Sequence, residues 1–156
     1  AHCGKFETMR GLRSGGALAA AVVVITAGCG PAAASDPIAG TSWQLLSIES
    51  MTTEQPTTTI DDPAKYTVAF GDNGLATFQI DCNRGSGTFQ TTAGGPDSGN
   101  LIFGPVGLTR MFCPQPSVDT TVAAALGRIR SYLLADGQLH LSMEADGGIM
   151  HWEPKA

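Results

Sequence analysis

Short segments in which apolar and polar residues alternate recur along the chain. The clearest covers residues 65–70, and a second covers 76–82 and places Cys82 among its apolar positions. Between them, the sequence Gly-Asp-Asn-Gly at 71–74 consists of residues that accept the positive φ angles of tight turns. Because alternate side chains of a strand point to opposite faces, the pattern predicts a β-hairpin that directs Cys82 into the core.

Further strands are predicted before and after this hairpin. An alternation that begins at Trp43 and continues to Ile48 predicts the first strand. The intervening segments are rich in Gly, Pro, Thr, Asp and Asn and are predicted to be loops, at 52–63, 83–87 and 91–100. The later strands are predicted at 88–90, 101–103, 106–111, 132–134, 139–143 and 149–152.

One helix is predicted over residues 118–129. Ser117 is a suitable N-cap, and Asp119 lies in the first turn, where the helix dipole favours an acid. The apolar positions of this segment follow helical spacing and form one stripe, made of Val118, Val122, Ala125, Leu126 and Ile129. One helix among many short antiparallel strands indicates an α+β domain, in which a mostly antiparallel, curved or partly closed β-sheet packs on one main helix.

The segment that begins at Met9 has the layout of a signal peptide. It starts with arginines at 10 and 13, continues with eleven apolar or small residues at 17–27, and ends at Gly28-Cys29. This arrangement resembles the processing site of a bacterial lipoprotein and predicts a leader over 1–28, with Cys29 as the lipidated N-terminus, a site for palmitate. Thr26 stands where Leu or Val is usual, which leaves an uncleaved anchor as the alternative. The apolar stretch is shorter than the roughly 20 residues that span a membrane.

After Cys29 the composition changes twice. Residues 29–40 contain mainly Ala, Pro, Ser and Gly, so they are predicted to form a flexible tether. The remaining segment, 41–153, has the length of a single domain. The whole chain contains 42% hydrophobic and 15% charged residues, a composition that indicates a folded protein rather than a disordered one.

The charge balance argues against polyanionic partners. The whole chain carries nine Lys and Arg against fourteen Asp and Glu, a net charge of -5. Removal of the leader takes away three cations and one anion, which leaves six cations, thirteen anions and a net charge of -7. Binding to nucleic acid or anionic lipid headgroups depends on clustered Lys and Arg, and no basic cluster is visible.

The cysteines indicate an oxidising compartment. Of four, Cys3 precedes Met9 and Cys29 is the predicted lipidation site, so Cys82 and Cys113 remain for the folded part. In an exported domain such a pair predicts one disulfide. Two buried free cysteines are the alternative, because cysteine also behaves as a small core hydrophobe.

No catalytic or metal-binding arrangement stands out. After the leader, the histidines are His140 and His151, and alternation places His140 on the outward face of its strand. A hydrolase would need a nucleophile beside a base, and structural zinc would need three or four spaced Cys or His ligands. The pairs Asp61-Asp62 and Asp72-Asn73 fit turns better than calcium loops. We therefore predict a non-enzyme with no metal and no cofactor.

The segment 82–87 is the one polar cluster of interest. A functional interpretation makes Asn83, Arg84 and Arg110 the rim of a binding site near the cysteine pair. The alternative is a glycine-rich turn whose asparagine caps local backbone groups, and the residue types favour this alternative.

Several motifs follow one another in a characteristic order and spacing: Trp43, Cys82-Asn83, Gly87, Phe89, the segment 109–113, the helix, and the ending Tyr132, Gly137, Leu139 and Leu141. In this order, from about Gly40 to Trp152, the domain resembles the META/HslJ-like domain of bacterial envelope proteins. Two departures occur: Phe112 replaces the small residue usual before the second cysteine, and the helix lacks the usual glutamate near its start, for which Asp119 is the nearest substitute.

The family is tied to heat-shock and envelope stress, without an agreed chemical activity. Together with the predicted lipid anchor, the tether, the acidic surface and the missing catalytic set, the resemblance favours a monomeric protein, lipid-anchored to the cell membrane and facing outside the cytoplasm. We expect this protein to be a non-catalytic interaction or stress-protection module with an envelope protein partner. The alternative is a carrier of a small apolar ligand or peptide at the cell surface. Such a carrier requires an open cavity between sheet and helix.

Overall fold

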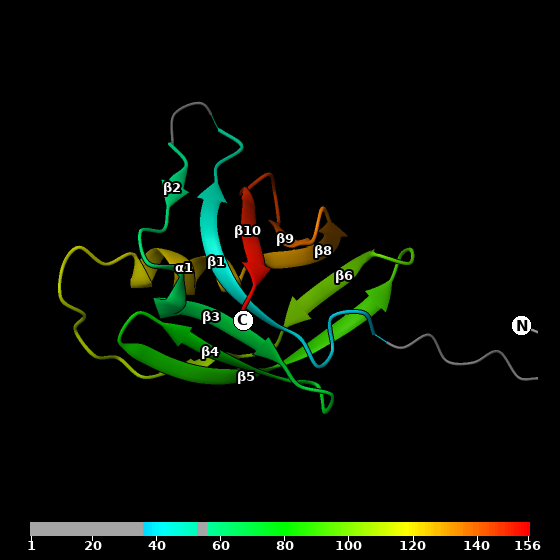
Figure 1. The fold of residues 1–156 in the computed structure, drawn as a ribbon, viewed down its shortest axis with the longest axis horizontal. Coiled ribbons are helices and arrows are strands. Elements are labelled where there is room, and N and C mark those ends of the chain that lie inside the picture. Colours follow the sequence, from blue (N-terminus) through cyan, green and yellow to red (C-terminus); the bar gives the residue numbers. More distant parts are fainter. Residues whose placement is uncertain (1–35, 53–55) are drawn as a thin grey trace, which may run out of the picture. The chain divides into compact units, whose positions relative to one another are not determined.

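A computed structural model describes residues 36–52 and 56–156 (Figure 1). These residues contain two helices, the single-turn 3-10 helix η1 (Pro63–Lys65) and the α-helix α1 (Asp119–Leu126). Their strands are β1 (Ser42–Glu49), β2 (Thr58–Thr59), β3 (Tyr66–Phe70), β4 (Leu75–Ile80), β5 (Asn83–Ala93), β6 (Ser98–Phe103), β7 (Gly107–Leu108), β8 (Ile129–Ala135), β9 (Gln138–Met143) and β10 (Ile149–Pro154).

Eight of these strands form a closed antiparallel barrel. Their order is β1-β3-β4-β5-β6-β8-β9-β10, and β10 pairs again with β1. The closing register places Trp43 opposite Pro154 and Ile48 opposite Met150. The short strands β2 and β7 add to β1 and β5.

The predicted α+β fold is therefore wrong: the described domain is mostly β, not a sheet packed on a main helix. The single α-helix has eight residues, of which Val122, Ala125 and Leu126 are buried. Alternating patterns predict most of the barrel strands at least in part, but they do not distinguish an open sheet from a closed one, because both bury every second side chain. Closure depends on pairing between the first and last barrel strands, which no local pattern reports.

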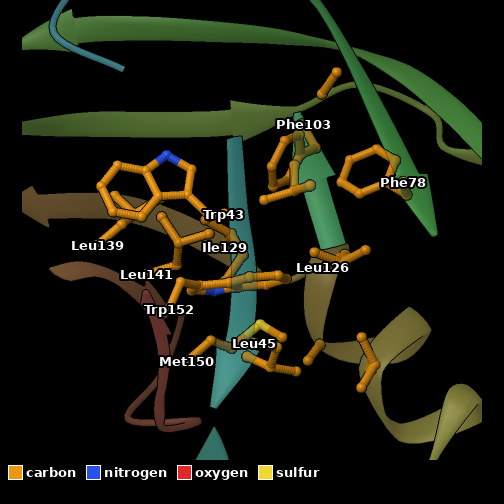
Figure 2. Packing of buried hydrophobic residues seen from close by; sticks show 14 of the residues in the cluster. Trp43, Leu45, Phe78, Phe103, Leu126, Ile129, Leu139, Leu141, Met150 and Trp152 are labelled. Carbon is orange, nitrogen blue, oxygen red and sulfur yellow. The ribbon is translucent and has the colours of Figure 1, made fainter. Parts of the chain in front are cut away.

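The interior of the barrel is a packed hydrophobic core (Figure 2). Trp43 and Leu45 of β1 and Met150 and Trp152 of β10 point inward and are buried. Aromatic rings fill the part beside β3, β5 and β6, where the centroids of Phe70 and Phe89 lie 5.0 Å apart in an edge-on arrangement. Small barrels of this strand number have interiors that side chains can fill, as they do here.

The predicted hairpin is confirmed, but the predicted direction of Cys82 is not. β3 and β4 pair with Phe70 opposite Ala76, across the turn at 71–74. β4 ends at Ile80, and a tight turn follows in which Asp81 has a positive φ of 54°. This turn starts the next strand immediately, so Asn83 pairs with Ile80 and is buried, while Cys82 lies half-buried in the turn.

Two predicted loops and one predicted strand also differ from the structure. The predicted loop at 91–100 is shorter, because β5 continues to Ala93 and β6 begins at Ser98. The segment 83–87, predicted as a glycine-rich loop, opens the long strand β5. A Cβ at Gly85 would collide with the carbonyl oxygen of Gly107, so glycine here permits the close approach of β7. The strand predicted at 106–111 is reduced to the two residues of β7.

Helix α1 is shorter than the predicted segment 118–129. Val118 rather than Ser117 occupies the N-cap position, although the Ser117 hydroxyl still accepts a hydrogen bond from the Asp119 N–H at 3.3 Å. Ile129 is buried as predicted but belongs to β8. The three strands predicted after the helix are confirmed as β8, β9 and β10.

The folded part begins before the predicted boundary at Thr41. Ile38 is fully buried in the core, and the Gly40 N–H donates to the Phe70 carbonyl oxygen at 2.8 Å. Residues 36–40 therefore belong to the domain rather than to a tether. The predicted leader and Cys29 lie outside the described residues. In the part that the structure describes, no helix is long and apolar enough to cross a membrane.

Candidate functional site

An open groove lies where β4 and β5 meet, between the segment 106–112 and the first turns of α1. Its volume is about 700 Å³, within the range of ligand-binding pockets. Its lining combines the apolar side chains of Ile80, Val106, Leu108, Met111, Phe112 and Ala123 with Asn83, Gly107, Thr109, Arg110, Asp119 and Thr120. The groove thus offers a largely apolar surface with one cation, Arg110.

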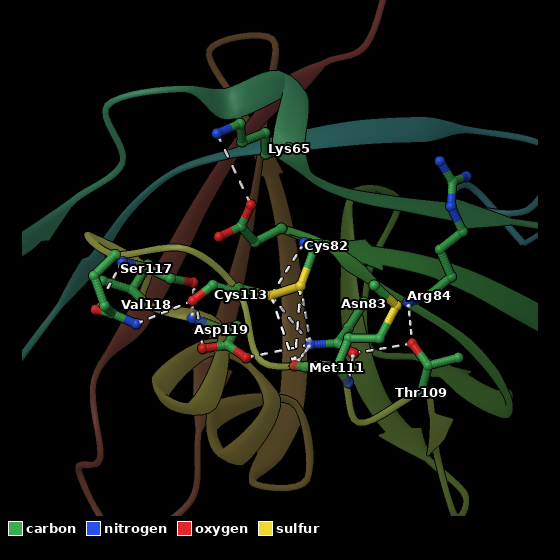
Figure 3. Close-up of a disulfide and its surroundings, with 12 residues drawn as sticks. Lys65, Cys82, Asn83, Arg84, Thr109, Met111, Cys113, Ser117, Val118 and Asp119 are labelled. Carbon is green, nitrogen blue, oxygen red and sulfur yellow. Dashed lines mark hydrogen bonds and ion pairs between the residues drawn. A yellow bond between two sulfur atoms is a disulfide. The ribbon is translucent and has the colours of Figure 1, made fainter.

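Asn83 organises one wall of this groove (Figure 3). Its Oδ1 accepts hydrogen bonds from the Thr109 hydroxyl at 2.9 Å and from the Met111 N–H at 2.8 Å. Its Nδ2 lies 3.2 Å from the Met111 carbonyl oxygen and 3.3 Å from Asp119 Oδ2. One buried side chain therefore connects the start of β5, the segment 109–111 and the first turn of α1.

A disulfide lies beside Asn83 and ties the same elements together. The structure places the sulfur atoms of Cys82 and Cys113 at bonding distance, 1.99 Å, with their Cα atoms 5.5 Å apart. The Cys113 sulfur also accepts from the Cys82 N–H and from Asn83 Nδ2, each at 3.3 Å. The segment between β7 and α1 is thereby fixed at both ends, although it contains no regular secondary structure.

The three residues of the predicted binding rim separate in the structure. Asn83 and Arg110 line the groove, but Arg84 lies with Lys155 on a different surface, next to β3 and β4. Figure 3 shows the Arg84 side chain directed away from the disulfide. Asn83 is only 5% exposed and its amide is fully engaged, so it supports the groove instead of presenting free groups to a ligand. Its partners are distant in sequence, not the local backbone groups of the alternative interpretation.

Sequence reasoning missed the most exposed apolar residues of the site. Phe112 is 89% exposed and Met111 is 60% exposed, both at the edge of the groove. The sequence feature that could have revealed them is a pair of large apolar residues just before a cysteine and two prolines, in a segment too short for a regular element. Assigning Met111 to a predicted strand concealed it.

The described residues contain no group of three or more His, Cys, Asp or Glu side chains arranged to hold a metal ion. Desolvation by burial raises the pKa of Tyr132, and the carboxylates of Asp36 and Asp97 raise it further. Tyr132 belongs to the barrel core and does not line the groove.

Comparison with protein families matches residues 36–155 to the META domain. The chain belongs to the META domain family. The match begins at Asp36, the first described residue, and covers all the described strands and the groove. None of the curated proteins matches the sequence significantly.

Two solved structures share the fold of this META domain. An NMR structure of a protein from Burkholderia xenovorans superposes with a TM-score of 0.60 at 19% identity, over 76% of this chain and 84% of that one. A crystal structure of a DUF4847 family protein from Bacteroides vulgatus superposes with a TM-score of 0.51 at 15% identity, over 75% of this chain and 94% of that one. At these identities the likeness concerns the fold alone.

Proposed function

We propose that this META-domain protein is a lipid-anchored protein of the bacterial envelope whose domain is a non-catalytic binding module. The groove beside the disulfide is its binding surface, and the occupant is an apolar segment of an envelope protein that carries a carboxylate. The observation that carries the proposal is the combination of exposed Met111 and Phe112 with a rigid support made by Asn83 and the disulfide.

The charge at the groove favours an acidic group in the partner. Within the described residues, the Arg110 side chain has no hydrogen-bond or ion-pair partner, whereas Asp119 is engaged by Asn83 and Ser117. A guanidinium that is free in the unbound domain can form a paired hydrogen bond with a carboxylate. Exposed aromatic, methionine and arginine side chains are also typical of protein interfaces.

A protein partner fits better than a small apolar ligand. Pockets for small molecules enclose most of the ligand surface, but this groove leaves Phe112 and Met111 facing solvent at its edge. The barrel interior, where a carrier would hold its ligand, is occupied by core side chains. Support for a carrier is correspondingly weaker.

Membrane anchoring rests on the sequence. Replacement of Cys29 by Ser should move the protein from the membrane fraction to the soluble or secreted fraction, because stable attachment would then lose its lipid chains. Fractionation of cells that express the wild type and the C29S variant provides the measurement. Tight membrane association of the C29S variant would contradict lipid anchoring.

The groove is tested by photo-crosslinking in living cells. A photoreactive phenylalanine analogue at position 112 should capture one envelope protein through an apolar segment that contains Asp or Glu, identified by mass spectrometry of the linked peptide. The same analogue at Ile102, which is 51% exposed on β6, is the control and should not capture that segment. Equal capture from both positions would contradict the assignment of the groove.

A further inference from the structure

Two histidines face each other on the outer surface of the barrel, away from the groove. His140 of β9 and His151 of β10 are direct cross-strand partners, and both belong to the outward-facing set of their strands. Their Nδ1 atoms lie 2.8 Å apart, and the rings meet edge to face with an interplanar angle of 77°. Among three histidines in the chain, the structure thus places two in contact.

A carboxylate orients this pair. Glu49 belongs to β1, which pairs with β10 on the edge opposite to β9, and its Oε2 is 3.0 Å from His151 Nε2. A carboxylate accepts hydrogen bonds, so in its neutral form His151 carries its proton on Nε2 and presents a lone pair at Nδ1. The facing Nδ1 of His140 then donates the proton of the N–H···N hydrogen bond.

We propose that His140 and His151 form a surface site for a divalent transition metal, with Cu²⁺ preferred, and that Glu49 is the residue that positions His151. Imidazole nitrogen suits copper, nickel and zinc, and Cu²⁺ binds most tightly among the divalent ions of the first transition row. Ligating histidines commonly donate their second ring N–H to a carboxylate, which is the arrangement of His151 with Glu49.

The two Nδ1 atoms are close enough for one metal ion to bind both at adjacent positions of a tetragonal site. Two nitrogens at about 2.0 Å from one metal and about 90° apart are about 2.8 Å from each other, and a tetrahedral arrangement would need a larger separation. Both rings must turn about their Cβ–Cγ bonds to direct their lone pairs at the metal, and this torsion is soft in histidine. The His140 proton moves from Nδ1 to Nε2 through solvent, so neutral rings release no net proton.

Water supplies the remaining ligands of this site. The described residues provide no third His, Cys, Asp or Glu grouped with the pair as a ligand. The His151 side chain is 23% exposed and the Glu49 side chain 52% exposed, so an ion can reach the site from solution. The site is therefore open, unlike a closed structural metal centre.

The test is NMR titration of the full chain with Cu²⁺. All samples carry Cys3→Ser, Cys29→Ser and His2→Gln, so that free thiols do not reduce the metal and the histidine beside the N-terminal amine does not compete for it. Substoichiometric Cu²⁺ should broaden amide signals next to positions 140 and 151, and His140→Gln or His151→Gln should each abolish this local broadening. Signals elsewhere in the spectrum report that each variant is folded.

Two further variants separate the role of Glu49 from a general charge effect. Glu49→Gln should weaken Cu²⁺ affinity at this site by about tenfold to hundredfold, the usual effect of losing such a partner. Glu153→Gln, on the same outer face but bonded to Gln44, should leave the affinity unchanged. Persistence of the broadening in both histidine variants, or broadening centred elsewhere, overturns the site. An equal effect of the two glutamate variants overturns the role of Glu49.

Discussion

At the residue scale, Asn83 is the side chain on which the groove depends most. It is buried, and it reaches backbone and side-chain groups of a segment that has no strand or helix of its own. Polar groups buried in this way stabilise a structure mainly because losing one partner leaves the others unsatisfied. The residue therefore couples stability to the shape of the groove.

Replacement of Asn83 by Ala should lower the free energy of unfolding by about 2 to 4 kcal/mol, because several buried groups around Met111 lose their partner. Denaturant unfolding followed by tryptophan fluorescence gives the value. Asn100→Ala, at an exposed position of β6, is the matched control and should cost less than about 0.5 kcal/mol. Similar costs for the two variants would show that the hydrogen-bond network contributes little.

The sequence indicated that Asn83 was of interest but not what it does. Asparagine beside glycine is typical of a turn, and the local interpretation followed from that composition. The partners of its amide lie more than 25 residues away, at Thr109 and Met111. Local composition carries no information about such contacts, so Arg84 was grouped with Asn83 although its side chain lies elsewhere.

At the element scale, the disulfide connects the β4–β5 turn to the segment before α1. Thirty residues lie between Cys82 and Cys113, which are separated by 31 positions. Closing a loop of this length should stabilise the domain by roughly 3 to 4 kcal/mol, because the cross-link lowers the conformational entropy of the unfolded chain. For a domain whose total stability is about 5 to 15 kcal/mol, this is a large fraction.

The disulfide makes a direct chemical prediction. Non-reducing peptide mapping of the exported protein should recover one linked pair of peptides that contain Cys82 and Cys113. The double variant with serine at both positions should have a free energy of unfolding lower by roughly 3 to 4 kcal/mol. The exported wild type should show no reactive thiol at either position. Free alkylation of both cysteines without a reductant would contradict the bond.

Elements were predictable where the pattern was local and unpredictable where a close approach decided the structure. The β3–β4 hairpin and the strands β8, β9 and β10 follow from alternation and from turn residues. The segment 83–87 looked like a loop because glycine is rare inside strands. Gly85 permits the contact with β7, and Gly87 permits the approach of Pro105 and Val106, which only the folded arrangement reveals.

At the scale of the whole molecule, the domain is a closed barrel with a filled interior and its binding features outside. Closure pairs β1 with β10, and this pairing also brings Glu49 beside His151. The order of strands could not be predicted, because every strand has one apolar face and this pattern does not specify which strands pair. Closure of the sheet also leaves no mark on the amino-acid composition. Because core side chains fill the interior, we propose the groove beside the disulfide as the surface that binds a partner.

The most direct measurement of the central claim is an NMR titration of the protein with a synthetic peptide. The peptide has the sequence of the partner segment that is crosslinked to the photoreactive residue at position 112. Our account predicts that amide shifts concentrate at 80–83, 106–112 and 119–123, around the groove, and that Arg110→Gln weakens binding about tenfold through loss of the carboxylate contact. Shifts concentrated on another face, or an affinity unchanged by the Arg110 variant when the peptide acid is present, would contradict it.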